Sequence, residues 1–235
     1  MENLPVYISI VFGLITLLTV FLFYKAAHHS TLAIAIIATW LLVQGIIAST
    51  GFYSVTNSFP PRFILLVLPP LVLIVVLFAT KKGRRFIASL DIKTLALLNI
   101  VRVPVEIVLL WLFLHNSIPQ IMTFEGRNFD ILSGLTAPVI YYFGFVRKTL
   151  NNKILIAWNV LCLILLINIV TLAILSAPFP FQQLSFDQPN VAILYFPFIW
   201  LPCCIVPLVL FSHLVSIRQL TREQKQMANF VVSNS

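Results

Sequence analysis

The residues best placed to do chemistry are three polar side chains inside one long apolar stretch. Asn99, Arg102 and Glu106 lie in the run TLALLNIVRVPVEIVLLWLFL, residues 94–114. Arg102 and Glu106 are four residues apart, so on a helix they share one face and can reach each other. A charge at the centre of a bilayer costs roughly 2.5–3.5 kcal/mol on insertion scales, so such residues are rare there and mark sites. We therefore expect this stripe to form a site for a small molecule, ion or proton.

Pro104 lies between the two charges and is expected to distort the same helix. Proline has no backbone N–H, so it leaves a carbonyl without its partner about one turn earlier, near Ile100. Lipid satisfies neither that carbonyl nor the charges, so the stripe must face other helices or a water-filled cavity. In the functional interpretation Arg102 binds an anionic group of the substrate and Glu106 couples to protons. The alternative is a structural ion pair that fixes helix packing.

The composition predicts an all-α integral membrane protein. The chain of 235 residues is 60% hydrophobic and only 9% charged, whereas a soluble domain is about 25% charged. Seven apolar runs are long enough to cross a bilayer, and we predict one helix from each: residues 4–24, 31–51, 62–80, 90–115, 129–146, 154–176 and 191–217. We thus expect a seven-transmembrane-helix bundle over residues 1–217, followed by a short basic tail, residues 218–235.

The distribution of basic residues predicts the orientation of this bundle. Twelve of the 15 Lys and Arg residues fall on one side of the predicted helices, in the loops after the first, third and fifth helices and in the tail. Only Arg62 and Arg127 lie on the other side. Basic loops stay in the cytoplasm, which places the N-terminus outside and the C-terminus inside the cytoplasmic (inner) membrane. The net charge of +8 therefore reflects topology, and we expect no nucleic-acid partner.

Further polar side chains in the predicted helices are candidates for the ligand site, namely Tyr141, Tyr142, Asn159 and Asn168. The two outer loops, residues 115–130 and 176–190, alternate aromatic and polar residues, which favours segments that return to the membrane interface. We expect these loops to form a lid over an outward-facing pocket, with the polar residues Glu125, Arg127, Asp130, Gln182, Gln183 and Asp187. The alternative is an aromatic belt with ordinary loops.

The histidines give no clear metal site. The predicted topology places His115 outside and His28, His29 and His213 inside, so the four cannot share one ion. A group of the three inner histidines stays geometrically open, but none has a helical His-x-x-x-His partner. We expect no metal and no cofactor. The absence of lysine from residues 191–217 also excludes the retinal site of a microbial rhodopsin.

Three functions fit these residues. The first is a transporter or channel-like protein for a small solute or ion. The second is a sensor or receptor-like module, which would bind a ligand from the outer side and carry no flux. The third is an intramembrane lipid-modifying enzyme using Glu106, His115 or Asp130 as acid or base, but no recognisable catalytic set supports it and an enzyme is less expected. The expected partners are the lipid bilayer and a small-molecule or ion ligand; a homo-oligomer is left open.

Overall fold

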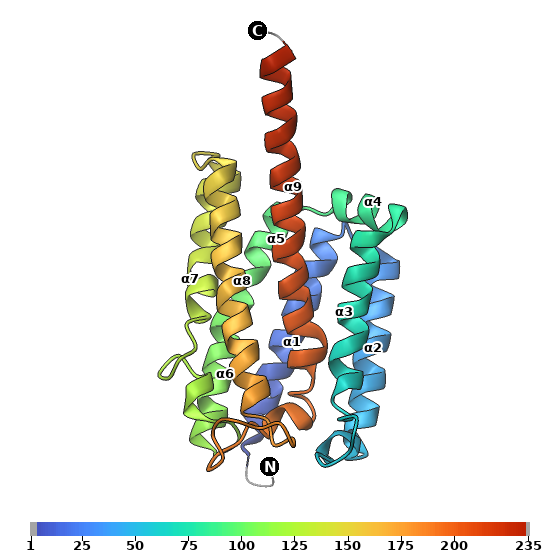
Figure 1. Cartoon of the computed structure of the whole chain (residues 1–235), viewed down its shortest axis with the longest axis vertical. Helices are drawn as coiled ribbons and strands as arrows, with labels where there is room; N and C mark the ends of the chain where they lie inside the picture. The colour runs from blue at the N-terminus through green and yellow to red at the C-terminus, as the bar shows by residue number, and fades with distance from the viewer. Residues whose placement is uncertain (1–3, 234–235) are drawn as a thin grey trace.

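The computed structural model describes residues 4–233, and this part of the chain is helical and contains no β-strand, which confirms the all-α prediction (Figure 1). The helices are α1 (Val6–Ala26), α2 (Thr31–Ser49), α3 (Ile64–Ala79), α4 (Lys81–Ser89), α5 (Ile92–Leu98), α6 (Arg102–Leu114), α7 (Ile131–Ile140), α8 (Asn152–Leu175) and α9 (Val206–Ser233). Four short 3₁₀ turns are η1 (Phe52–Ser54), η2 (Asn99–Val101), η3 (Gln120–Met122) and η5 (Ala192–Leu194). Two π-helical segments are η4 (Tyr141–Val146), which continues α7, and η6 (Leu201–Ile205), which leads into α9.

Several of these helices are consistent with a membrane protein. Within residues 4–233, five helical segments are long and apolar enough to cross a bilayer: Val6–Ala26, Thr31–Ser49, Ile92–Leu114, Asn152–Leu175 and Leu201–Gln226. Helices α3 and α4 would add a sixth if counted as one span, but the chain bends by 94° between them. Ile131–Val146 is apolar but shorter. The predicted count of seven is therefore not confirmed by helix length.

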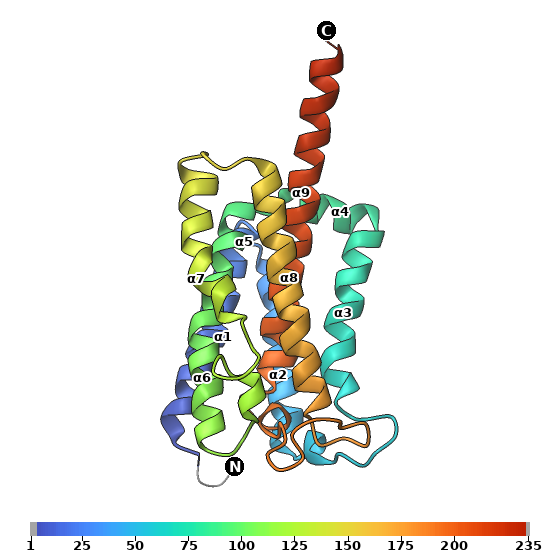
Figure 2. The ribbon, with the colours of Figure 1, turned by 60° about the vertical axis from the view of Figure 1, so that its left-hand side comes forward.

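Two ends of the bundle differ in charge and in backbone. We call one the basic end, because α4 and the turn at residues 147–151 lie there with Lys81, Lys82, Arg84 and Arg85, and α9 continues past it (Figure 1). We call the other the loop end, because α1 begins there, the segments 50–63 and 176–200 gather there and the segment 115–130 starts there (Figures 1 and 2).

Side-chain caps fix where several helices begin. The side chains of Ser30, Thr80, Asp91 and Asn151 accept backbone N–H groups in the first turns of α2, α4, α5 and α8. Such caps satisfy donors that a helix leaves free at its start. Because Thr80 both follows α3 and caps α4, the chain turns sharply there. Helix α4 consequently lies across the basic end instead of prolonging α3 (Figure 1).

The predicted fourth helix is distorted close to the expected position. α5 ends at Leu98, the tighter 3₁₀ turn η2 covers Asn99–Val101, and α6 starts at Arg102. Pro104 lies in the first turn of α6, where a missing N–H has little cost. The segment Ile92–Leu114 nevertheless counts as one span, so Arg102 lies near its middle.

Two predicted helices have different bounds in the structure. The fifth begins at Ile131, since residues 115–130 leave α6 at the loop end and climb beside it before α7 starts (Figure 2). The seventh begins at Leu201 and not at residue 191, and Pro202 lies in its first turn, where a missing N–H has little cost. α9 then runs without a break to Ser233. The predicted boundary at residues 217 and 218 falls inside this helix, and residues 1–3 and 234–235 lie outside the described part.

Candidate functional site

Arg102 is the centre of a network of buried polar side chains. Its Nη1 donates to Oδ1 of Asp130 at 2.9 Å and to the carbonyl of Cys162 at 3.4 Å. Its Nη2 lies 3.2 Å from Nε2 of His213. These groups come from α6, α8, α9 and the segment before α7, and Arg102, Asp130 and His213 are 3%, 6% and 0% exposed. Three helices and one loop therefore converge on a single guanidinium group.

Arg102 pairs with Asp130 and not with Glu106, which differs from the sequence-based expectation. The Arg102–Asp130 contact is the only ion pair between acidic and basic side chains in the part of the chain that the structure describes. Glu106 instead accepts a hydrogen bond from Nδ2 of Asn128 at 2.5 Å. Asn128 and Asp130 both come from the segment that returns beside α6, and this segment supplies the partners of both charges. The expectation that protein shields Arg102 and Glu106 together is confirmed, because both are buried.

His213 is held as a neutral imidazole by its two partners. Nδ2 of Asn159 donates to the Leu155 carbonyl at 2.8 Å, which sets the orientation of that amide. Oδ1 of Asn159 lies 2.8 Å from Nδ1 of His213 and can only accept, so Nδ1 carries the proton. Nε2 then accepts from Arg102, since a guanidinium can only donate. His213 thus links α6 to α8 through one chain of hydrogen bonds.

His213 does not lie with His28 and His29, so the three histidines predicted on the inner side do not form one group. His213 is fully buried, whereas Nε2 of His28 bonds the Ser89 carbonyl at the exposed basic end. Among the described residues, no three His, Cys, Asp or Glu side chains are placed to hold a metal ion. The three cysteines Cys162, Cys203 and Cys204 are free thiols buried in the bundle.

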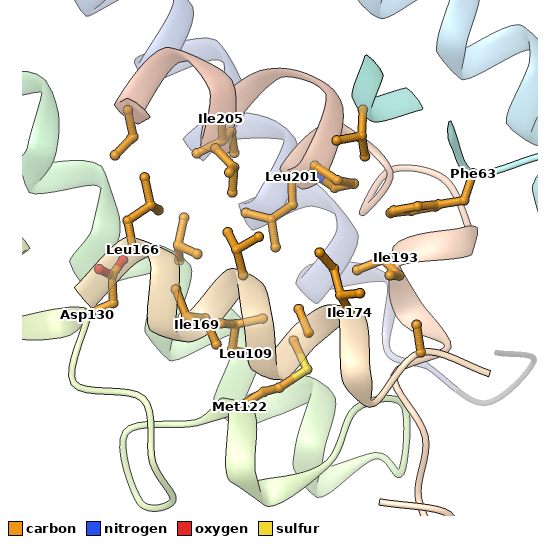
Figure 3. A pocket seen from close by; sticks show the side chains of 18 of the residues that line it. Phe63, Leu109, Met122, Asp130, Leu166, Ile169, Ile174, Ile193, Leu201 and Ile205 are labelled. Atoms are coloured by element: carbon orange, nitrogen blue, oxygen red, sulfur yellow. The ribbon is translucent and has the colours of Figure 1, made fainter. Parts of the chain in front are cut away.

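A cavity of about 130 Å³ adjoins the charged network (Figure 3). Arg102, Glu106 and Asp130 are its charged lining residues, and aliphatic side chains such as Leu109, Leu166, Ile169, Leu201 and Ile205 make up most of its wall. Asp130 and Phe63 lie at opposite ends of the cavity (Figure 3). Nε of Arg102 and Oε2 of Glu106 are both buried and have no hydrogen-bond partner in the protein. The residues that line the cavity therefore include one donor and one carboxyl oxygen without a protein partner.

Aromatic side chains line the cavity towards the loop end. The ring of Phe179 lies 5.6 Å from that of Phe63 and 5.3 Å from that of Phe181, measured between centroids. Phe179 is buried, while Phe181 is 43% exposed. The loop at residues 176–190 thus contributes two aromatic rings to the cavity wall.

The structure places the remaining predicted ligand residues outside the cavity lining. Asn99 donates to the carbonyls of Leu95 and Ala96 in its own helix, and its Oδ1 has no partner. Asn168 donates to the Arg127 carbonyl at 2.9 Å and so ties α8 to the returning segment. Tyr141 and Tyr142 lie in η4, where the hydroxyl of Tyr142 accepts from Arg147 at the basic end. Asn159 acts on the cavity only through His213.

The predicted lid residues separate into two groups. Glu125, Arg127, Gln183 and Asp187 are exposed, and Gln182 bonds carbonyls of its own loop. Asp130 is not a lid residue: it is buried against Arg102 and lines the cavity. The cavity lining includes Asp130, Phe179 and Phe181 from these loops, but none of the other predicted lid residues.

Sequence reasoning missed two residues of the network, Asn128 and His213. His213 lies in an apolar run with Ser212 and Ser216, and a titratable residue in such a run is a site candidate by default; this signal was present. Asn128 gave no comparable signal, because its role depends on a segment folding back beside α6.

Comparison with known proteins adds a family and no activity. No curated protein and no solved structure matches the chain. A family described as "Domain of unknown function (DUF8737)" matches residues 60–221, a range that begins just before α3 and ends within α9. The range includes every residue of the charged network and most of the cavity wall. Because the match covers more than half of the chain, the protein belongs to this family of domains of unknown function.

Proposed function

We propose that the chain crosses the cytoplasmic membrane seven times, with its basic end in the cytoplasm and its loop end outside. The sixteen residues of α3 reach about 24 Å at 1.5 Å per residue. Helix α7 with η4 is of similar length. In this proposal it forms one membrane crossing together with residues 115–130, which supply the part on the side of the loop end. Irregular backbone at membrane depth is tolerated where protein buries it. In this segment backbone groups bond each other, as in the 3.2 Å contact from Arg127 N–H to the Ile121 carbonyl.

The bound ligand is, in this proposal, a small zwitterion with an aliphatic body, such as an apolar amino acid. Nε–H of Arg102 suits a carboxylate, and Oε2 of Glu106 suits an ammonium group. The aliphatic wall suits an uncharged side chain. A cavity of about 130 Å³ is smaller than the roughly 300–1,000 Å³ of drug-sized pockets, which favours a ligand of few atoms.

The activity that we assign to this site is proton-coupled transport of the zwitterion. The single observation that carries the proposal is the pair of unpartnered buried atoms, Arg102 Nε and Glu106 Oε2, on residues that line one apolar cavity. A buried polar group without a partner costs about 1–3 kcal/mol, so a ligand that satisfies both groups gains affinity. Glu106 contacts no counter-ion, whereas Asp130 balances Arg102, so Glu106 is the residue that exchanges a proton during transport.

Uptake into proteoliposomes tests this function. We expect the purified protein to accumulate labelled leucine, valine or proline when the lumen is alkaline. Ala173→Phe, on α8 in the cavity wall, should abolish uptake by filling the cavity. Ala157→Phe lies on the same helix but is exposed outside the cavity, and should leave uptake unchanged. Failure of the wild type to accumulate any of the three, or equal uptake in both variants, contradicts the proposal.

One contact supports a second candidate, a ligand sensor. Arg102 bonds His213 on α9, and α9 continues from the cavity wall past the basic end to Ser233. A ligand that draws Arg102 away from His213 would change how α9 packs, and a partner at the basic end would respond to that change. This candidate predicts saturable binding of the labelled amino acids, blocked by Ala173→Phe, without accumulation in the lumen. The same proteoliposomes therefore separate sensor from transporter.

A further inference from the structure

A second cavity lies on the opposite side of α9 from the charged network and holds no part of it. It has a volume of about 780 Å³ and is formed by α2, α3, the start of α4 and the η6–α9 junction. We call it the lateral groove, and its lining includes Ala35, Ile36, Leu73, Leu77 and Phe211. Lys82, on α4, is its one charged lining residue.

The groove exists because α2 and α3 barely bury each other. Of the nineteen residues of α2, only Leu41, Gln44 and Ala48 are buried, and of the sixteen residues of α3, only Leu66 and Ile74. Trp40 of α2 donates to the Cys203 carbonyl at 3.0 Å, which attaches α2 to the η6–α9 junction. Because the walls of the groove are apolar and open, an apolar molecule is the kind of ligand that fits between them.

The groove is long enough to hold an acyl chain of one leaflet. Its lining on α2 runs from Ser30, beside the basic end, to Val43. At 1.5 Å per residue this is about 20 Å, somewhat more than the roughly 15 Å that one leaflet contributes to a hydrocarbon core of about 30 Å. A lipid tail that enters beside α4 and ends near mid-membrane fits this span.

The position of Lys82 at the mouth is fixed by a close approach of α4 to α3. A Cβ atom on Gly83 would lie 2.3 Å from the Leu77 carbonyl oxygen, so only glycine allows the corner to close. Arg84 reinforces the corner by donating to the Ala79 carbonyl at 2.6 Å. Arg84 is held by this hydrogen bond, and the charged side chain that lines the groove is Lys82. The neighbouring Lys81 is not part of the lining.

We propose that the lateral groove is a binding site for an anionic glycerophospholipid of the leaflet at the basic end, with an acyl chain between α2 and α3 and the headgroup phosphate on Lys82. Juxtamembrane lysines attract anionic headgroups, and the cytoplasmic leaflet is the anionic one. The inference rests on the membrane placement proposed above and is independent of transport at Arg102.

Native mass spectrometry of the full chain released from nanodiscs with equal phosphatidylglycerol and phosphatidylcholine tests this site. We expect the wild type to retain phosphatidylglycerol at least about threefold over phosphatidylcholine. Lys82→Gln should remove this preference and Lys81→Gln should keep it. Ala35→Phe, in the groove, should reduce retention of both lipids, whereas exposed Ala38→Phe, outside it, should not.

Equal retention of the two lipids by the wild type, or equal retention within either pair of variants, overturns the lipid site. All four substitutions lie at surface positions, and an unchanged thermal unfolding midpoint confirms that each variant is folded. Because no amino acid is present, the result does not depend on transport. A chain that fails to insert into nanodiscs instead contradicts the membrane placement.

Discussion

At the residue scale, the balance of charges around Arg102 decides what the site can do. Arg102 has one counter-ion, Asp130, while Glu106 has only the amide of Asn128. Breaking a buried ion pair by removing one partner is costly because a charge is left without compensation. Neutralising Glu106 removes no such pair. The two carboxyl groups should therefore respond differently to amide substitution.

Asp130→Asn should lower the free energy of unfolding by about 3–5 kcal/mol, because the buried guanidinium loses its counter-charge. Asp187→Asn is the control, since that carboxylate is exposed at the loop end and should change stability by less than about 0.5 kcal/mol. Thermal unfolding in detergent micelles measures both. Equal midpoints for the two variants would show that the ion pair adds nothing to stability.

The burial of Arg102 and Glu106 follows from the sequence, but their partners do not. Hydrocarbon excludes two charges in the middle of an apolar run, so the sequence alone predicts that protein surrounds them. Asp130 is 28 residues from Arg102, and spacing carries no information about a contact that a folded-back loop creates. His213 could have been found, because it interrupts an apolar run in the same way.

At the scale of elements, the site depends on how closely α7 packs against the start of α6. A Cβ atom on Gly134 would lie 2.8 Å from Cγ2 and 2.9 Å from the backbone nitrogen of Val103. This contact holds Asp130, just before α7, at the level of Arg102. Sequence periodicity cannot reveal such a contact, because glycine in an apolar helix has several explanations.

Gly134→Ala should destabilise the protein by about 1–3 kcal/mol, because the added methyl group forces α7 away from α6. Gly13→Ala on α1 is the matched control: no atom lies within 4 Å of its Cβ position, and alanine favours the helix. Unfolding midpoints of the two variants should therefore move in opposite directions. A midpoint for Gly134→Ala at or above that of the wild type would contradict this packing.

At the scale of the whole molecule, basic segments that are far apart in the sequence lie at one end of the bundle. α4 and the turn at residues 147–151 lie at the same end, as the loop charges predicted. The right-angled turn into α4 was not predicted, because residues 62–80 form one apolar run and the turn depends on the Thr80 cap and Gly83.

Reporter fusions test the proposed topology. A fluorescent protein fused after residue 149 or after Ser235 should fold in the cytoplasm and fluoresce. Alkaline phosphatase fused after Asp187, in an exposed loop-end segment, should be active outside. Each reporter is also fused at the other reporter's position. An active phosphatase after residue 149, or a fluorescent protein that fluoresces after residue 187, would show the opposite orientation.

We propose that Arg102 and Glu106 bind a zwitterion in a buried cavity and that Glu106 exchanges a proton during its transport. Proton movement driven by leucine, valine or proline into proteoliposomes tests this claim most directly. Glu106→Gln keeps the acceptor for Asn128 but cannot exchange a proton, so proton movement should fall at least about tenfold. The exposed control Glu125→Gln should match the wild type. Proton movement in Glu106→Gln equal to that of Glu125→Gln would contradict the account.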